Sequence, residues 1–127
     1  MDGTSGKASE VDPALHKKML QLLSSLWMTR AIGAFARLRL ADAMAQGAQD
    51  HAAIAAARGL LPDRVYRLLR ALSTIGIVSE PTRGRFELTP LGRLLSSSAP
   101  NSIATTAILL NDYLADMWNH LDAALAG

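Results

Sequence analysis

Three histidines, each with a carboxylate a few residues away, are the side chains of this sequence best suited to acid–base or metal chemistry. Imidazole can transfer a proton near neutral pH or ligate a metal ion. However, His16, His51 and His120 stand far apart, and no ligand spacing such as H-x-x-x-H joins two of them. A folded site that unites the three stays open, but separate surface histidines are the simpler interpretation, and we predict no metal site.

Other signatures of catalysis are missing from the sequence. Ser96-Ser97-Ser98 lacks the flanking glycines of a nucleophile elbow and is predicted to be a loop. Zero cysteines exclude disulfides, thiolate metal sites and cysteine nucleophiles. Glycines occur singly, without the G-x-G-x-x-G turn that cradles a dinucleotide phosphate: Gly33, Gly47, Gly59, Gly76, Gly84 and Gly92. We therefore expect no catalytic and no cofactor-binding residue in this chain.

Composition indicates one folded domain with an uneven charge. The chain has 127 residues, of which 50% are hydrophobic, enough for one core. It has no apolar run that could cross a bilayer and no signal-peptide core, so we expect a soluble cytoplasmic protein without membrane contacts. Residues 30–93 carry ten arginines and five acids, a balance of +5, whereas residues 94–127 carry three acids and no base. The basic region suits either phosphate binding or solvated arginines paired with nearby acids.

The N-terminal region predicts three helices behind a short leader. Residues 1–11 are small and polar, and we expect them to be disordered. Asp12 is placed to cap a helix that starts at Pro13 and carries an apolar stripe as far as Trp27. Two further helices are expected over residues 31–40 and 41–46, the second ended by Gly47.

Residues 51–89 predict a winged helix-turn-helix. A short helix over residues 54–58, capped by Asp50, is followed by the turn at Gly59 and a helix over residues 62–72 that presents Arg67 and Arg70 outward. Two strands over residues 77–80 and 85–89, joined by a turn at residues 81–84, form the wing. Thr89-Pro90 then opens a short helix over residues 91–95.

The segment after Pro100 predicts a strongly apolar helix, which together with the first helix supplies more apolar surface than one small domain can cover. Its apolar residues alternate steps of four and three, as in helix–helix packing, although an ordinary core helix is the alternative. We predict a mainly α fold, with a small two-stranded wing and extra terminal helices, that forms an intertwined dimer. The predicted dimer interface comprises Leu15, Met19, Leu22, Leu23, Leu26, Ile103, Leu110, Leu114 and Leu121.

The order of the motifs resembles a known family. The matching segments are Leu40-Ala41-Asp42-Ala43-Met44-Ala45, Ala53-Ile54-Ala55-Ala56-Ala57-Arg58-Gly59, Tyr66-Arg67-Leu68-Leu69-Arg70-Ala71-Leu72, Gly76-Ile77-Val78, Phe86-Glu87-Leu88-Thr89-Pro90-Leu91-Gly92 and Trp118-Asn119-His120-Leu121. From about Leu20 to Gly127 the chain resembles the N-terminal domain of S-adenosylmethionine-dependent O-methyltransferases of the plant phenolic and bacterial polyketide-tailoring type. The arginine-leucine helix combined with the Phe-x-Leu-Thr-Pro-x-Gly wing is the most specific part.

The resemblance implies a homodimerisation domain, here residues 12–127, whose first and last helices help to close a substrate cavity. A Rossmann-like catalytic domain that binds S-adenosylmethionine normally follows, and the chain could dock on such a domain, but its glycine-rich turn has no counterpart up to Gly127. We expect this polypeptide alone to bind no cofactor and to methylate nothing, and an aromatic or polyketide-like substrate is implied for the whole enzyme. Candidate cavity residues are Trp27, Met28, Asn111, Tyr113, Met117 and Trp118, with packing in a core or interface as the alternative role.

A DNA-binding transcriptional regulator is the second interpretation of the winged helix. Arg64, Arg67 and Arg70 would then enter the major groove, while Arg83 and Arg85 would contact phosphates. The start of the recognition helix speaks against it, because residues 60–62 are two leucines and a proline, with few groups that can bind base edges. We therefore favour the methyltransferase domain and expect no nucleic-acid partner.

Overall fold

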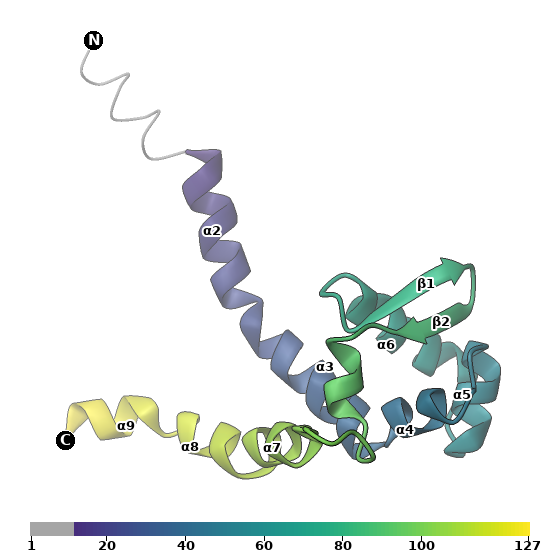
Figure 1. Cartoon of the computed structure of the whole chain (residues 1–127). Coiled ribbons are helices and arrows are strands. Elements are labelled where there is room, and N and C mark those ends of the chain that lie inside the picture. The colour runs from purple at the N-terminus through teal and green to yellow at the C-terminus, as the bar shows by residue number, and fades with distance from the viewer. Residues whose placement is uncertain (1–11) are drawn as a thin grey trace.

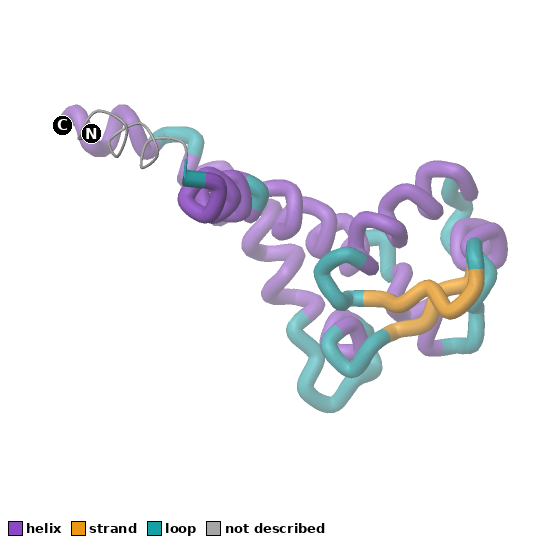
Figure 2. The backbone as a smooth tube through the Cα atoms, turned by 90° about the horizontal axis from the view of Figure 1, so that it is seen from above, coloured by secondary structure: helices purple, strands orange, loops and turns teal. Residues whose placement is uncertain are grey.

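The computed structural model describes residues 12–127 as a winged core from which two helical arms project on one side (Figures 1 and 2). We call residues 13–30 the N-terminal arm and residues 110–127 the C-terminal arm. Figure 1 shows the arms diverging from a common base at α3 and α7, with the wing on the other side of the core. The leader expected over residues 1–11 lies outside the described residues. None of the described helices is both long and apolar enough to span a membrane.

The first two helices follow each other almost in line. Asp12 caps α2 (Pro13–Leu23) as predicted, because its Oδ1 accepts a hydrogen bond of 2.9 Å from the amide of Ala14. The prediction of one helix as far as Trp27 was wrong, since α2 ends before Ser24 and α3 (Ser25–Arg37) starts immediately after it. The hydroxyl of Ser24 donates to the carbonyl of Leu20, and such a side-chain bond within a helix competes with the backbone ladder.

The boundaries predicted for the next two helices were also wrong. α3 ends at Arg37 and α4 spans Leu40–Ala45, whereas the sequence predicted helices over residues 31–40 and 41–46. The break lies at Arg39, which adopts a left-handed backbone conformation with φ 56°. A non-glycine residue is rare there, so sequence patterns place no helix end at an arginine.

The predicted helix-turn-helix is confirmed, but its first helix starts three residues earlier and ends one residue earlier than the predicted range 54–58. α5 (His51–Ala57) begins at Asp50, whose carboxylate accepts a hydrogen bond of 2.9 Å from the amide of Ala52. α6 spans Pro62–Ser73 and buries Val65, Leu69 and Leu72. The predicted end signals are confirmed, because Gly59 and Gly76 both have positive φ.

The wing consists of β1 (Val78–Thr82) and β2 (Arg85–Leu88), paired antiparallel with Val78 opposite Leu88. The predicted turn at residues 81–84 was too long, since Pro81 lies within β1 and only residues 83–84 form the turn. The register is irregular between Ser79 and Thr82, which is where a strand tolerates proline.

The C-terminal region is more broken than predicted. η1 (Gly92–Leu95) is a 3-10 turn, and α7 (Ala104–Leu109) leads into the π-helical turn η2 (Leu110–Leu114), followed by α8 (Ala115–Trp118) and α9 (Leu121–Ala126). The prediction of one helix was therefore wrong: the turn widens at Leu110 and the helix is interrupted at Asn119 and His120.

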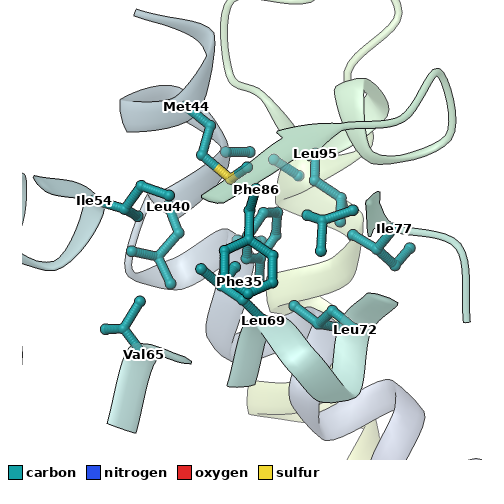
Figure 3. Close-up of a cluster of buried hydrophobic side chains, with 14 of the residues drawn as sticks. Phe35, Leu40, Met44, Ile54, Val65, Leu69, Leu72, Ile77, Phe86 and Leu95 are labelled. Atoms are coloured by element: carbon teal, nitrogen blue, oxygen red, sulfur yellow. The ribbon is translucent and has the colours of Figure 1, made fainter. Parts of the chain in front are cut away.

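The core gathers apolar side chains from the helices and the wing around Phe35 and Phe86 (Figure 3). Both phenylalanines are fully buried. The amide of Phe86 donates 2.8 Å to the carbonyl of Gln49, so the wing is also tied to the segment between α4 and α5. The mainly α, winged fold class is confirmed, and the core is complete without either arm.

Candidate dimerisation surface

The N-terminal arm carries a long exposed apolar face. No residue of α2 is buried, and Leu23 is 68% exposed. Leu15, Met19, Leu22 and Leu26 follow each other in steps of four and three, which places them on one face of a helix. Burying one such side chain is worth roughly 1.5–3 kcal/mol, so this face has a strong tendency to pair.

The C-terminal arm carries a second apolar surface with a hollow. The hollow has a volume of about 370 Å³ and is lined by Leu110, Leu114, Met117, Trp118, His120, Leu121 and Ala124. Trp118 is 69% exposed, although its indole is the largest apolar side chain of this arm. Exposed apolar patches of this kind mark interaction surfaces.

The nine residues predicted for the dimer interface are all exposed in the single chain. Eight of them lie on the two arms and Ile103 precedes α7. They are thus accessible to a second chain, and their role in pairing stays a prediction.

The six candidate cavity residues do not line one common pocket. Trp27 and Met28 lie on α3, whereas Met117 and Trp118 line the hollow of the C-terminal arm. Asn111 borders a smaller pocket of about 190 Å³ between α3 and α7. The role of these residues in substrate binding also stays a prediction.

Polar contacts fasten the C-terminal arm to α3. Arg37 forms an ion pair with Asp112, and the guanidinium of Arg30 donates 3.2 Å to the backbone carbonyl of Asn111. The Asn111 amide also donates 3.0 Å to the carbonyl of Thr29. The base of the arm is therefore held although its apolar face is exposed.

Asp42 forms a buried polar network that the sequence analysis missed. Its carboxylate accepts hydrogen bonds from the Ser97 amide at 2.7 Å, the Ser97 hydroxyl at 2.8 Å, Arg39 Nε at 2.9 Å and the Ser96 hydroxyl at 3.1 Å. Burial alone raises the pKa of Asp42, but the four hydrogen bonds, led by those from Ser97, outweigh burial and lower this pKa to about 2. The serine run predicted as a plain loop therefore holds α4 in place.

The three histidines are not brought together. His16 is exposed on α2, His120 borders the hollow of the C-terminal arm, and His51 packs against Tyr66 with 5.0 Å between ring centres and an angle of 59° between the rings. Within residues 12–127 no three histidine or carboxylate side chains are grouped as metal ligands. The open alternative of one site that unites the three histidines finds no support in their positions within the described chain.

Two of the arginines considered for DNA binding, Arg70 and Arg85, already have partners within the chain. Arg70 lies 3.3 Å from Glu80 and donates 2.9 Å to the hydroxyl of Tyr66, and Arg85 donates 2.8 Å to Gln49. The bond to Tyr66, with the charges of Tyr66 and Glu80, raises the pKa of Arg70. Arg70 thus fits the alternative of an arginine paired with a nearby acid rather than a free phosphate-binding group.

A winged core with an apolar helical arm at each end defines the chain as a winged-helix domain of the dimerising type. The sequence profile described as the O-methyltransferase dimerisation domain matches residues 20–98, and the chain belongs to this family.

Curated relatives agree with the family. The phenazine O-methyltransferase PhzM of Lysobacter antibioticus is 31% identical over 82% of this chain and 30% of the relative. The O-demethylpuromycin-O-methyltransferase of Streptomyces alboniger is 28% identical over 94% of this chain and 34% of the relative. The chain spans about a third of the length of these relatives.

Solved structures show the same fold. The crystal structure of LaPhzM superposes with a TM-score of 0.83 at 28% identity, covering 88% of this chain and 34% of that one. The pyocyanin biosynthetic protein PhzM gives 0.82 at 26% identity, covering 91% and 34%. The chain is thus a dimerisation domain of the small-molecule O-methyltransferase type, and none of these relatives supports DNA binding.

Proposed function

We propose that this chain pairs with a second copy of itself through its two arms and forms the dimerisation part of a natural-product methyltransferase. The observation that carries this proposal is the exposed apolar face of α2, which no other part of the described chain covers. An intertwined pair, in which each arm packs on the arms of the other copy, would bury both faces at once. The excess of apolar surface at the arms is typical of obligate partners.

The charge distribution supports the same arrangement. Beyond Asp112, which already pairs with Arg37, the C-terminal arm carries Asp116 and Asp122 and no basic residue, while the N-terminal arm carries Lys17 and Lys18. Opposite charges on the two arms favour contact between the N-terminal arm of one copy and the C-terminal arm of the other.

Sedimentation analysis of matched leucine variants tests the pairing. Leu22 and Leu61 are 57% and 59% exposed. Leu22 lies on the N-terminal arm, whereas Leu61 lies on the surface of the winged core, immediately before α6. We expect a dimer at tens of micromolar that Leu22→Glu dissociates, because a buried unpaired carboxylate is strongly unfavourable, while Leu61→Glu leaves it intact. A stable monomer of the native chain, or equal effects of the two variants, would contradict the proposal.

We further propose that the domain, residues 12–127, belongs to an enzyme that transfers a methyl group from S-adenosylmethionine to an aromatic or polyketide-like molecule. The similarity to phenazine and puromycin methyltransferases supports this class. The catalytic domain and the cofactor site would be supplied by a Rossmann-like part on which this domain docks, in the cytoplasm. The reading frame beyond Gly127 tests this: we expect a glycine-rich turn after a first strand within about a hundred residues, and a frame without it contradicts the assignment.

The apolar arms would also help to close the substrate cavity of that enzyme. Met117 and Trp118 in the hollow of the C-terminal arm are the residues best suited to contact a flat aromatic ring. Titration with phenazine-1-carboxylate, followed by tryptophan fluorescence, tests this role. We expect quenching that Trp118→Phe removes and Trp27→Phe leaves in place, because only Trp118 lines the hollow; quenching that neither variant alters would contradict it.

A further inference from the structure

Asn111 lies at the point where the C-terminal arm leaves the core, and its side chain spans two helices. Its Nδ2 donates 3.0 Å to the carbonyl of Thr29 on α3 and 2.9 Å to the carbonyl of Ala107 on α7. A side-chain amide has two N–H donors, so both are satisfied by backbone carbonyls. The residue thus ties the arm to α3 by hydrogen bonds of fixed direction.

Gly33 provides the space for this contact. A Cβ atom at position 33 would overlap the amide group of Asn111. The glycine has an ordinary helical conformation, so its role is the close approach of the two helices and not a special backbone angle. Gly33 therefore leaves a notch on α3, and the side-chain amide of Asn111 fills this notch.

Two neighbouring contacts hold the same turn. Arg30 donates to the backbone carbonyl of Asn111, and Arg37 forms an ion pair with Asp112. Arg30, Gly33 and Arg37 are spaced by three and four residues, so they lie on one face of α3. That face receives the first residues of the π-helical turn.

The π-helical turn decides where the arm's apolar face points. A helical residue turns the chain by about 100°, so one extra residue in the turn rotates everything after it by roughly that angle. The Asn111 amide bonds the carbonyl of Ala107, which is the acceptor that the backbone amide of residue 111 would use in an α-helix. This competition favours the wider turn, and the direction of Met117 and Trp118 depends on it.

We propose that Asn111, seated in the Gly33 notch, is a positioning residue that sets the direction of the C-terminal arm and thereby the orientation of its apolar face. The inference rests on the proposed function, since a correctly directed arm is what a second copy would engage. Asn111 acts here through its contacts with α3 and α7.

Spin-label distance measurement tests the proposal directly. Because the chain has no cysteine, Arg67→Cys on α6 and Ala123→Cys on α9 introduce two labels and no others. Labelled chain diluted into unlabelled chain reports the distance within one copy. We expect one narrow distribution for the native sequence, and a shifted and broader one for Asn111→Ala.

A double-mutant cycle separates positioning from mere loss of stability. Gly33→Ala should displace the arm because its methyl group takes the space of the Asn111 amide, whereas adding Asn111→Ala to it should restore a narrower distribution. Asn101→Ala, which removes an exposed asparagine in the loop before α7, is the control and should change nothing. The thermal unfolding of the winged core is recorded for every variant.

The outcomes distinguish this inference from the proposed dimer. A native distribution in Asn111→Ala, or additive effects of the two substitutions, overturns the positioning role. Sedimentation of the same samples reports pairing independently, so a monomer with an arm fixed by Asn111 would contradict the dimer and leave the positioning role standing.

Discussion

Asp42 connects residue-level electrostatics to the stability of the whole core. The carboxylate is only 5% exposed and joins α4 to the serine loop 55 residues further along the chain. Its pKa of about 2 lies below the ordinary aspartate value of 3.8 because hydrogen bonds to the charged form outweigh burial. A carboxyl group whose pKa is lowered by folding stabilises the folded state at every pH at which it is ionised in both the folded and the unfolded chain.

This stability is expected to be lost in acid. The contribution of Asp42 is complete above pH 4 and falls as the pH drops from about 4 to about 2, because the unfolded chain then binds the proton more readily. The loss should amount to about 2 kcal/mol, as measured by urea unfolding at each pH. Asp42→Asn should be less stable at neutral pH and should lose this part of the pH dependence; an unchanged acid profile would contradict the assignment.

Position 92, in the segment after the wing, has no room for a side chain. A Cβ atom at this position would overlap the backbone carbonyl of Ile77, which also accepts a hydrogen bond of 2.9 Å from the Thr89 hydroxyl. A backbone carbonyl cannot move aside as a flexible side chain can. We expect Gly92→Ala to lower the free energy of unfolding by about 1–3 kcal/mol in urea titrations. Arg93→Ala, at the exposed neighbour, should change it by less than about 0.5 kcal/mol.

At the scale of elements, the sequence predicted helix ends that are set by residues close to them in the chain. Asp50 and Gly59 were identified as the ends of α5, and Pro62 as the start of α6, because capping and proline preferences act within a few residues. The left-handed conformation of Arg39 and the inclusion of Pro81 in β1 were missed. Both depend on neighbours that the sequence does not place, namely Asp42 and the irregular pairing with β2.

The C-terminal arm shows the same limit more strongly. The steps of four and three from Ile103 to Leu125 fit one helix, yet the turn widens where Asn111 meets Gly33, 78 positions earlier in the chain. The Asp42 network likewise joins distant segments. The sequence pattern predicted the apolar residues that form exposed stripes on the two arms. The polar contacts between distant elements could be identified only from the structure.

The cap of α5 offers a test at this scale. Asp50→Ala should remove the hydrogen bond to the Ala52 amide and lower the free energy of unfolding by about 1 kcal/mol. Asp50→Ser keeps a capping oxygen and should retain most of the stability. Equal losses in the two variants, measured by urea unfolding, would show that the carboxylate acts by another route, such as its contact with His51.

At the scale of the molecule, the winged core and the two arms have different sources of stability. The core buries Phe35, Phe86 and their neighbours within one chain, whereas α2 buries no residue. In the proposed dimer the arms gain their apolar contacts only from the second copy. Folding of the arms and association are then linked, and the apparent stability depends on chain concentration.

The melting temperature should therefore rise with concentration. Scanning calorimetry of the native chain from a few micromolar to several hundred micromolar should show a steady increase, because mass action favours the folded dimer over unfolded chains. Leu22→Glu removes the pairing and should give a lower melting temperature that is the same at every concentration, while Leu61→Glu, at nearly the same exposure, should keep the native trend. If the native chain melted at one temperature throughout this range, the arms would have to find their contacts elsewhere than in a second copy.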